Sequence, residues 1–405
     1  MTARWVPLKH LALLNPETLD ESTPDDLGFR YIDIAATGRG RLISPPQPMT
    51  FGSAPSRARR ILRSGDTILS TVRTYLRAVW TLRGDDDDLV ASTGFVCLRP
   101  NDEVDPRYLG WLADSDLVVE EVVARSVGVS YPAINPSEVG TIKVPLRPLE
   151  EQRAIADHLD RETTRIDALI GAKGRMLKVL EERYWTAFMQ RVAHQSSQRT
   201  PLRRILTSLI DGPFGSAFSS SDYSDEGAAV VRLGNIGFGE YRTSEQARIP
   251  MALYERFRAY AVDSGDLLIA GLGDDRNHAG RACVAPALGP AIVKGKCFRA
   301  RADPSRVSAE FLALLLSSPI GSAAMSIAGR GSTRSMINLE IVKSTEVWLP
   351  TRSRQDEIVA ESRADRVRTR AAQVTIRRQL QVLFERRQAM ITTAVTGDLP
   401  VSVAV

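Results

Sequence analysis

Two long proline-free stretches, residues 149–192 and 352–393, carry apolar side chains at helical spacing. Apolar positions recur every three, four or seven residues and charged residues fill the other faces, which predicts two amphipathic helices. A helix of this length is roughly 65 Å long at ~1.5 Å per residue. Such a helix is expected to lie against a partner as a coiled coil, the alternative being a solvated helix packed on one domain. The expected coiled-coil positions are Ile155, Leu159, Ile166, Leu169, Leu177, Leu180, Ile358, Val374, Leu380 and Leu383.

The second half of the chain repeats the first. Five residues around the first helix recur 203 positions later: Val144, Leu146, Gln152, Ile155 and Leu180 correspond to Val347, Leu349, Gln355, Ile358 and Leu383. Earlier landmarks recur as well: Ser64-Gly65-Asp66 returns 200 positions later as Ser264-Gly265-Asp266, and Gly128 and Asn135 return after 203 as Gly331 and Asn338. Between these landmarks the two copies share little. The pattern indicates one scaffold used twice with two different surfaces.

Each copy mixes predicted strands and helices. In the first copy we expect strands at 29–34, 67–72 and 95–98, a basic turn at 38–41 and an amphipathic helix at 107–123. The predicted fold class is therefore α/β (α+β), with two similar globular domains, two long helices and a pseudo-two-fold internal repeat. The expected boundaries are 1–148 for the first domain, 149–195 for its helix, 196–350 for the second domain, 351–396 for its helix and 397–405 for a tail.

Composition narrows the class of protein. The 405 residues carry a net charge of +5, 43% are hydrophobic and 25% are charged, as in ordinary globular proteins. Cys97, Cys283 and Cys297 are too few and scattered for a disulfide framework and indicate a reducing compartment. The first twenty residues lack the apolar core of a signal peptide, and no stretch approaches a membrane span. We therefore expect a cytoplasmic protein without membrane contact.

No catalytic or metal-binding pattern is complete. The run from Gly289 to Lys296 has one residue too many for a phosphate-binding loop, and Cys297 stands where Ser or Thr is needed. The four histidines are far apart and none has metal-ligand spacing. We predict that this chain is not an enzyme and holds neither a metal nor a cofactor. Binding is then the default function.

Polar residues suited to DNA recognition gather in predicted loops. Arg and Lys neutralise phosphates, and Arg and Asn grip base edges with paired hydrogen bonds. The candidates in the first domain are Arg39, Arg41, Arg57, Arg59, Arg60, Arg73, Tyr75, Arg77, Ser130 and Tyr131. Those in the second domain are Asn235, Arg276, Asn277, His278, Arg281, Lys294, Lys296, Arg330, Thr333 and Arg334. As a set they predict contact with double-stranded DNA.

Three segments of the chain form a distinctive layout. They are the loop at 128–135 (GVSYPAIN), the run Leu149-Glu150-Glu151-Gln152-Arg153-Ala154-Ile155 with the long helix that follows, and the ending from Arg386 to Gly397. This layout resembles the DNA specificity subunit of type I restriction–modification enzymes. The start of the second long helix departs from this pattern. There Arg354-Gln355-Asp356-Glu357-Ile358 stands in place of the Glu-Glu-Gln-Arg-x-Ile found at the start of the first helix. The architecture covers the whole chain, and the two helical regions are the specific part.

The resemblance implies a function. Each domain would be a target recognition domain for one half of a bipartite, gapped DNA sequence, and the two helices would pair antiparallel and fix the gap. The chain would be non-catalytic. It would position two methyltransferase subunits, which use S-adenosylmethionine, and two restriction/translocase subunits, which use ATP and magnesium. Two alternatives remain: a non-catalytic helical-repeat scaffold that binds protein partners without DNA specificity, and a standalone enzyme with an unrecognised site.

Overall fold

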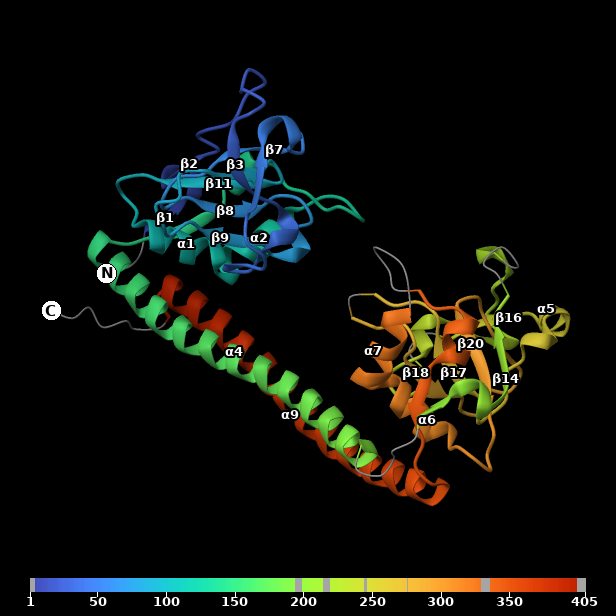
Figure 1. Cartoon of the computed structure of the whole chain (residues 1–405). Coiled ribbons are helices and arrows are strands. Elements are labelled where there is room, and N and C mark those ends of the chain that lie inside the picture. Colours follow the sequence, from blue (N-terminus) through green and yellow to red (C-terminus); the bar gives the residue numbers. More distant parts are fainter. Residues whose placement is uncertain are drawn as a thin grey trace. The chain divides into compact units, whose positions relative to one another are not determined.

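The computed structural model describes residues 4–193, 199–213, 219–243, 246–274, 276–328 and 336–398. Two compact units make up the chain (Figure 1): Met1–Gly174 with Ile376–Val405, and Arg175–Thr375. Each long helix is divided between the units. Among the described residues, no helix is both long and apolar enough to cross a membrane.

The first domain is built from short strands and three short helices. Its strands are β1 (Arg4–Pro7), β2 (Ala12–Leu14), β3 (Gly28–Ile32), β4 (Thr37–Gly38), β5 (Arg41–Leu42), β6 (Gln47–Thr50), β7 (Ala58–Ile61), β8 (Thr67–Ser70), β9 (Val79–Thr81), β10 (Leu89–Ser92), β11 (Phe95–Pro100) and β12 (Lys143–Leu146). Its helices are α1 (Pro106–Asp114), α2 (Asp116–Arg125) and α3 (Pro136–Val139). The strands form four-stranded sheets of order β6-β3-β10-β7 and β2-β11-β8-β9, with the pairs β1-β12 and β4-β5 beside them.

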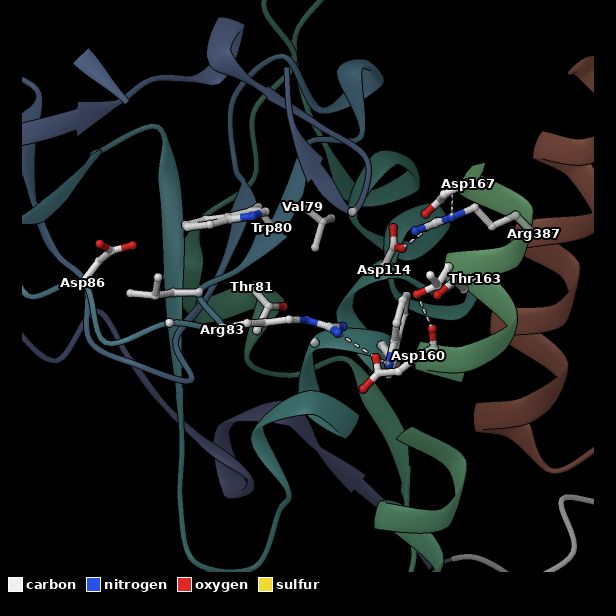
Figure 2. Close-up of a pocket in the computed structure, with 16 residues that line it drawn as sticks. Val79, Trp80, Thr81, Arg83, Asp86, Asp114, Asp160, Thr163, Asp167 and Arg387 are labelled. Carbon is white, nitrogen blue, oxygen red and sulfur yellow. Dashed lines mark hydrogen bonds and ion pairs between the residues drawn. The ribbon is translucent and has the colours of Figure 1, made fainter. Parts of the chain in front are cut away.

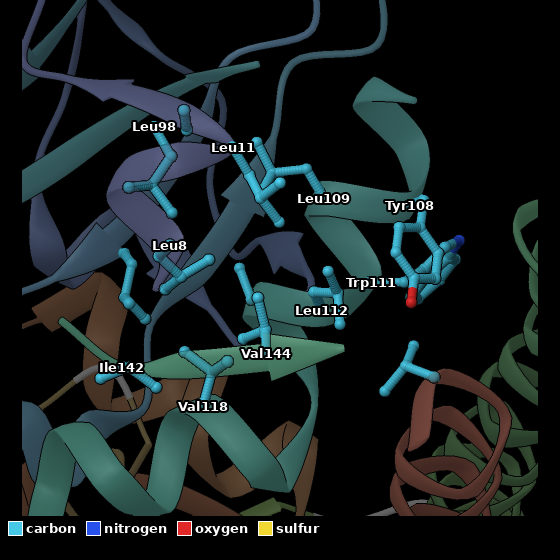
Figure 3. Close-up of a cluster of buried hydrophobic side chains, with 14 of the residues drawn as sticks. Leu8, Leu11, Leu98, Tyr108, Leu109, Trp111, Leu112, Val118, Ile142 and Val144 are labelled. Carbon is cyan, nitrogen blue, oxygen red and sulfur yellow. The ribbon is translucent and has the colours of Figure 1, made fainter. Parts of the chain in front are cut away.

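The main core of this domain lies between the strands and helix α1. Figure 3 shows Leu109 and Leu112 of α1 beside Leu8, Leu11 and Leu98, all within one buried cluster. The same cluster includes residues of α4 and α9, so the domain and the helices share a core. Burial of apolar surface at about 25 cal/mol per Å² therefore also fixes how this domain meets the helix pair.

The predicted strands of the first domain agree with the structure except at their ends, but the predicted helix is broken in its middle. The strand expected at 67–72 is β8, and all four of its residues are buried. The helix expected at 107–123 is two helices, since Ser115 has extended dihedral angles and its hydroxyl donates to the Leu112 carbonyl at 2.6 Å. A serine that bonds its own backbone in this way competes with helix continuation.

The second domain uses the same kinds of element. Its strands are β13 (Arg199–Pro201), β14 (Leu206–Asp211), β15 (Ala228–Val231), β16 (Ala247–Ile249), β17 (Leu267–Ala270), β18 (Ala282–Val284), β19 (Ala291–Val293), β20 (Cys297–Ala302) and β21 (Glu346–Trp348). Its helices are α5 (Met251–Arg256), α6 (Ala309–Ser317), α7 (Pro319–Ala328) and α8 (Leu339–Ser344). The sheet orders are β14-β20-β17-β18 and β16-β15-β19, with the pair β13-β21.

The long helices α4 (Leu149–Ala193) and α9 (Arg352–Thr396) pack against each other in both units. In the first unit Asp167 contacts Arg387 and Lys173 contacts Gln379. In the second unit Glu181 bonds Gln373. Later residues of α4 meet earlier residues of α9, so the helices are antiparallel (Figure 1). The predicted pairing of two long helices is confirmed.

The seam between the helices is less apolar than predicted. Leu169 and Val374, both expected on the stripe, are 52% and 47% exposed and lie outside it. The seam passes instead through their neighbours Ile170, which is buried, and Gln373, which is half-buried. The prediction placed Leu169, three residues after Ile166, on the apolar stripe. The buried residue is Ile170, four residues after Ile166, because the seam follows a repeat of seven residues. The expected Ile155, Leu159, Ile166 and Ile358 are buried, while Leu177, Leu180, Leu380 and Leu383 are half-buried.

One glutamine clamps each domain to its helix in the same way. The buried Gln152 side chain accepts from the Asp105 amide at 2.8 Å and donates to the carbonyls of Glu103 and Arg147 at 3.0 and 2.8 Å. The buried Gln355 accepts from the Ser308 amide at 2.8 Å and donates to the carbonyls of Arg306 and Pro350 at 3.1 and 2.9 Å. Every one of these partners recurs after 203 positions. The internal repeat therefore extends to individual hydrogen bonds.

Candidate nucleic-acid interface

A cavity of about 450 Å³ opens on the first domain between the strand ends and the loop at 128–131. Its lining includes three predicted DNA contacts, Arg57, Arg73 and Tyr131. The Arg73 guanidinium lies over the Tyr131 ring, 4.9 Å from its centroid, in a cation–π contact. The volume falls within the ~300–1,000 Å³ typical of ligand sites. Three of the predicted contacts are thus brought together.

The loop at 128–131 projects from a firmly bonded base. Val127 and Ala133 exchange backbone hydrogen bonds of 2.9 and 3.0 Å, and the Arg73 amide donates to the Pro132 carbonyl at 2.8 Å. Gly128 makes the tight turn with φ of 121°, where an added Cβ would meet the Tyr131 carbonyl oxygen at 3.1 Å. We name residues 127–131 the finger. Its residue Ser130 is exposed, so the finger presents this predicted contact to solvent.

Three of the predicted arginines in the first domain are exposed and lack an acidic partner among the described residues. Arg41, Arg57 and Arg73 form no ion pair with any residue that the structure describes. By contrast, Arg39 binds Asp114 and Asp116, and Arg77 binds Glu120 at 2.8 Å. An exposed guanidinium without a carboxylate is the group best able to bind phosphate. Arg41, Arg57 and Arg73 are therefore the strongest candidates, and Arg39 and Arg77 the weakest.

The other predicted contacts of this domain are intermediate cases. Arg59 stacks over the Phe51 ring at 4.5 Å. Arg60 donates to the Thr18 hydroxyl at 3.2 Å, and burial lowers the pKa of its guanidinium. Tyr75 is exposed on the turn that precedes Arg77. Tyr75 is therefore accessible, while Arg59 and Arg60 are both half-buried.

In the second domain the loop that carries the predicted contacts Arg276, Asn277 and His278 has a defined form. Asp274 accepts hydrogen bonds from the amides of Arg276 and Asn277, each at 2.8 Å. The Arg276 side chain is exposed and forms no ion pair with the described residues. His278 lies against Phe238, and its ring nitrogens contact the carbonyls of Ala279 and Ser317. This arrangement presents Arg276 to solvent and holds Asn277 and His278 against the domain.

Asn235 and Arg281 hold the second domain together from inside. The buried Arg281 guanidinium donates to four backbone carbonyls, those of Leu233, Ile236, Leu272 and His278. Burial lowers its pKa. The buried Asn235 accepts from the Arg232 amide and donates to the Arg242 carbonyl. Both side chains are buried and hydrogen-bonded to the backbone of the loops that they join, so we do not assign them to the interface.

Of the remaining candidates in the second domain, the two lysines lie in the described part of the chain and the other three do not. Lys294 donates to the Tyr223 hydroxyl at 2.8 Å, and the amide of Lys296 donates to Asp211 at 3.3 Å with a φ of 69° at Lys296. Arg330, Thr333 and Arg334 lie outside the described residues.

The junction between the first domain and the helices was missed by sequence reasoning. The buried Asp114 accepts from Arg39 at 3.3 Å and from Arg387 of α9 at 3.2 Å, and Arg387 also binds Asp167 of α4 at 3.1 Å (Figure 2). The Trp111 ring contacts the guanidinium groups of both Arg83 and Arg387. A cavity of about 410 Å³ lies beside these groups. The sequence did contain one signal for this junction. Gln152 recurs 203 positions later as Gln355, and each glutamine lies where a domain meets its helix.

The described residues contain no grouping that could hold a metal ion. The three cysteines are buried and free, and burial raises the pKa of their thiols, to about 12 for Cys283 and Cys297. A protonated buried thiol is a poor nucleophile.

Comparison with known proteins relates this architecture to one group. Over 161 residues the chain is 24% identical to the type I restriction enzyme MjaVIII specificity subunit of Methanocaldococcus jannaschii, which covers 36% of this chain and 37% of that protein. Over 284 residues it is 22% identical to the type I restriction enzyme StySPI specificity subunit of Salmonella potsdam, covering 66% and 60%. The chain is related to type I specificity subunits. The matches span less than two thirds of the length of either of these relatives.

A solved structure supports the same fold. A chain from a type I restriction–modification system, studied for complex assembly and conformational transition, superimposes with a TM-score of 0.69 at 24% identity and covers 98% of both chains. No family model matches the chain. The predicted resemblance to type I specificity subunits is confirmed by these relatives, and the predicted fold class by this superposition.

Proposed function

We propose that this chain is the DNA specificity subunit of a type I restriction–modification complex. The observation that carries the proposal is the clamp made by Gln152 and Gln355, which holds two copies of one scaffold by the same three hydrogen bonds. A scaffold copied with this accuracy, but with different exposed arginines on its loops, suits a protein that reads two different half-sites.

In this proposal residues 1–148 and 196–350 are the two target recognition domains, and residues 149–195 and 351–396 are the spacers. Each domain reads one half of a bipartite, gapped sequence in double-stranded DNA. Arg41, Arg57 and Arg73 in the first domain and Arg276 in the second supply phosphate or base contacts. The antiparallel helices set the gap between half-sites.

The chain itself is proposed to be non-catalytic and free of cofactors. Two methyltransferase subunits would supply S-adenosylmethionine chemistry, and two restriction/translocase subunits would use ATP and magnesium. The complex would act in the cytoplasm, where chromosomal DNA is accessible. The junction of domain and helix, with the half-buried Asp160 and the exposed Asp167, is the surface beside which such partners would sit.

The test is to map methylated bases across the genome of the source strain, with and without this gene. Loss of one split, gapped motif on deletion is expected. Replacing residues 1–148 should then change one half of that motif, and changing the length of α4 should change the gap alone. If deletion leaves every motif in place while the methyltransferase partner is expressed and active, the proposal fails.

A further inference from the structure

The cavity beside the finger differs from the junction cavity in the ion pairing of its arginines. In the junction cavity Arg83 and Arg387 bind Asp160 and Asp167. The cavity around Arg57 and Arg73 holds two arginines that form no ion pair with the described residues. A concave site that holds unpaired cations and an aromatic ring is complementary to a nucleotide, which combines an anionic phosphate with a flat base.

The rest of the lining suits a base. Thr93 is exposed at the rim and Ser92 is buried, so hydroxyl groups are available at two depths. The Asp33 carboxylate, which caps a helical turn by accepting from the Ala36 amide at 2.9 Å, also lines the cavity. Carboxylate and hydroxyl groups accept hydrogen bonds from the amino groups on base edges. The Tyr131 ring is 66% exposed, which leaves surface for stacking.

The finger carries exposed apolar side chains, a second feature that suits a protein that moves a base out of a duplex. A nucleotide that leaves a duplex creates a gap in the stack, and proteins that distort DNA fill or open such gaps with apolar side chains. Val129 at the end of the finger is 102% exposed and Val127 is 81% exposed. Val129 is thus an apolar side chain presented to water two residues from the cavity wall at Tyr131, where it can reach a bound duplex.

We propose that the cavity of the first domain receives one nucleotide extruded from the bound DNA duplex, with Val129 entering the space that it leaves. Tyr131 and Arg73 stack on the extruded base and Arg57 binds its phosphate. The recognition of that position then depends on the cavity as well as on groove contacts. This inference rests on the proposed function, because it requires that the first domain bind its half-site.

The experiment uses the full chain, co-expressed with the methyltransferase of its own system, and duplexes that carry the half-sites found by methylation mapping. Each base pair of the first half-site, apart from the methylated one, is mismatched in turn by changing one strand at a time. A mismatch lowers the cost of unpairing a base that leaves the duplex. Fluorescence anisotropy of a terminal dye measures binding, and a mismatch at one position is expected to tighten binding several-fold while mismatches elsewhere weaken it or leave it unchanged.

Two variants and a matched control sharpen the outcome. Tyr131→Ala and Val129→Ser should lose most of this gain. Leu13→Ser, an exposed apolar position of β2 outside the cavity, should keep the gain of the wild type. Saturable binding that no mismatch tightens would overturn the inference and leave the proposed function standing. Absence of any sequence-specific binding in the anisotropy signal would overturn both.

Discussion

The two junctions between domain and helix are built on the same positions but use different chemistry. At the first, Asp114, Arg387 and Asp167 form a buried chain of charges around Trp111. The positions 203 residues away from Trp111 and Asp114 are Leu314 and Ser317, and the position 203 residues before Arg387 is Tyr184. The buried charged groups at these positions in the first copy are thus replaced by aromatic, apolar and hydroxyl side chains in the second.

The second junction relies on aromatic packing. Tyr184, Trp185, Phe188 and Phe311 form a run of ring contacts, with centroid distances from 4.9 to 6.4 Å. Arg366 lies 4.6 Å above the Tyr184 ring and binds Glu181 at 2.7 Å. The Ser317 hydroxyl bonds the backbone of Gly239 and Ala282. The comparison teaches that the glutamine clamps were retained as a pair while the charged contacts around them diverged freely.

The largest effect is expected at the shared clamps. Gln152→Ala and Gln355→Ala each leave three backbone groups without their partners, a loss of about 3–5 kcal/mol at ~1–3 kcal/mol for each unsatisfied group with partial relief by water. Chemical denaturation measures the loss, and the exposed Gln381→Ala, which removes one surface hydrogen bond to Glu385, is the control. Similar losses for the two clamps are expected. A loss confined to one of them would show that the copies are not held alike.

The next effect separates the junctions. Arg387→Met removes one of two cations that bind the buried Asp114 and is expected to cost about 3 kcal/mol, near the lower end for breaking a buried ion pair. Ser317→Ala, at the position that corresponds to Asp114, removes a neutral hydroxyl and is expected to cost about 1–2 kcal/mol. The ratio of the two losses in thermal and chemical unfolding is the measurement. Equal losses would contradict the assigned difference in chemistry.

A third effect concerns DNA binding by the two copies. Arg73→Ala and Arg276→Ala are each expected to weaken binding by about 1–3 kcal/mol, and each should act on a different half-site. Competition among duplexes with one altered half-site distinguishes them, and the slope of log K against log salt reports lost phosphate contacts. Arg77→Ala, whose side chain is paired with Glu120, is the matched control and should change binding least.

The smallest effect is a difference in pH dependence. Burial, the largest influence, raises the pKa of Asp114 although Arg387 and Arg39 lower it. Burial also acts to raise the pKa of Glu181, but hydrogen bonds from Arg366, Gln373 and Trp185 bring it below its ordinary value. A raised carboxyl pKa contributes stability that is lost as pH rises through the folded-state pKa, beginning near 3.8. A lowered pKa contributes stability that is lost as pH falls below about 4.5.

Denaturation between pH 3 and pH 7 therefore should separate the variants Asp114→Asn and Glu181→Gln. The advantage of the wild type over Asp114→Asn is expected to shrink as pH rises, and its advantage over Glu181→Gln to grow. Parallel pH profiles for the two variants would contradict the assigned directions.

Much of the fold was predictable because it depends on local patterns. The long helices follow from apolar spacing without proline, and the buried β8 follows from a β-branched run after Ser64-Gly65-Asp66. The candidate interface was predictable at the level of loops. The sequence did not show which arginines lack an ion pair. Arg39 and Arg41 are two residues apart, yet Arg39 is bound by Asp114, a residue 75 positions away. Only the folded chain brings such partners together.

The sequence by itself determined the repeat, its period, the two helices and the absence of complete catalytic motifs, because these depend on residue identity at fixed spacing. Tertiary structure alone decided which cations lack a carboxylate, that the finger and three predicted contacts surround one cavity, and that the helix seam passes through Ile170 and Gln373 instead of Leu169 and Val374. The physical reason is that burial and ion pairing depend on distances between residues far apart in the chain. A pattern of neighbours along the sequence does not contain those distances.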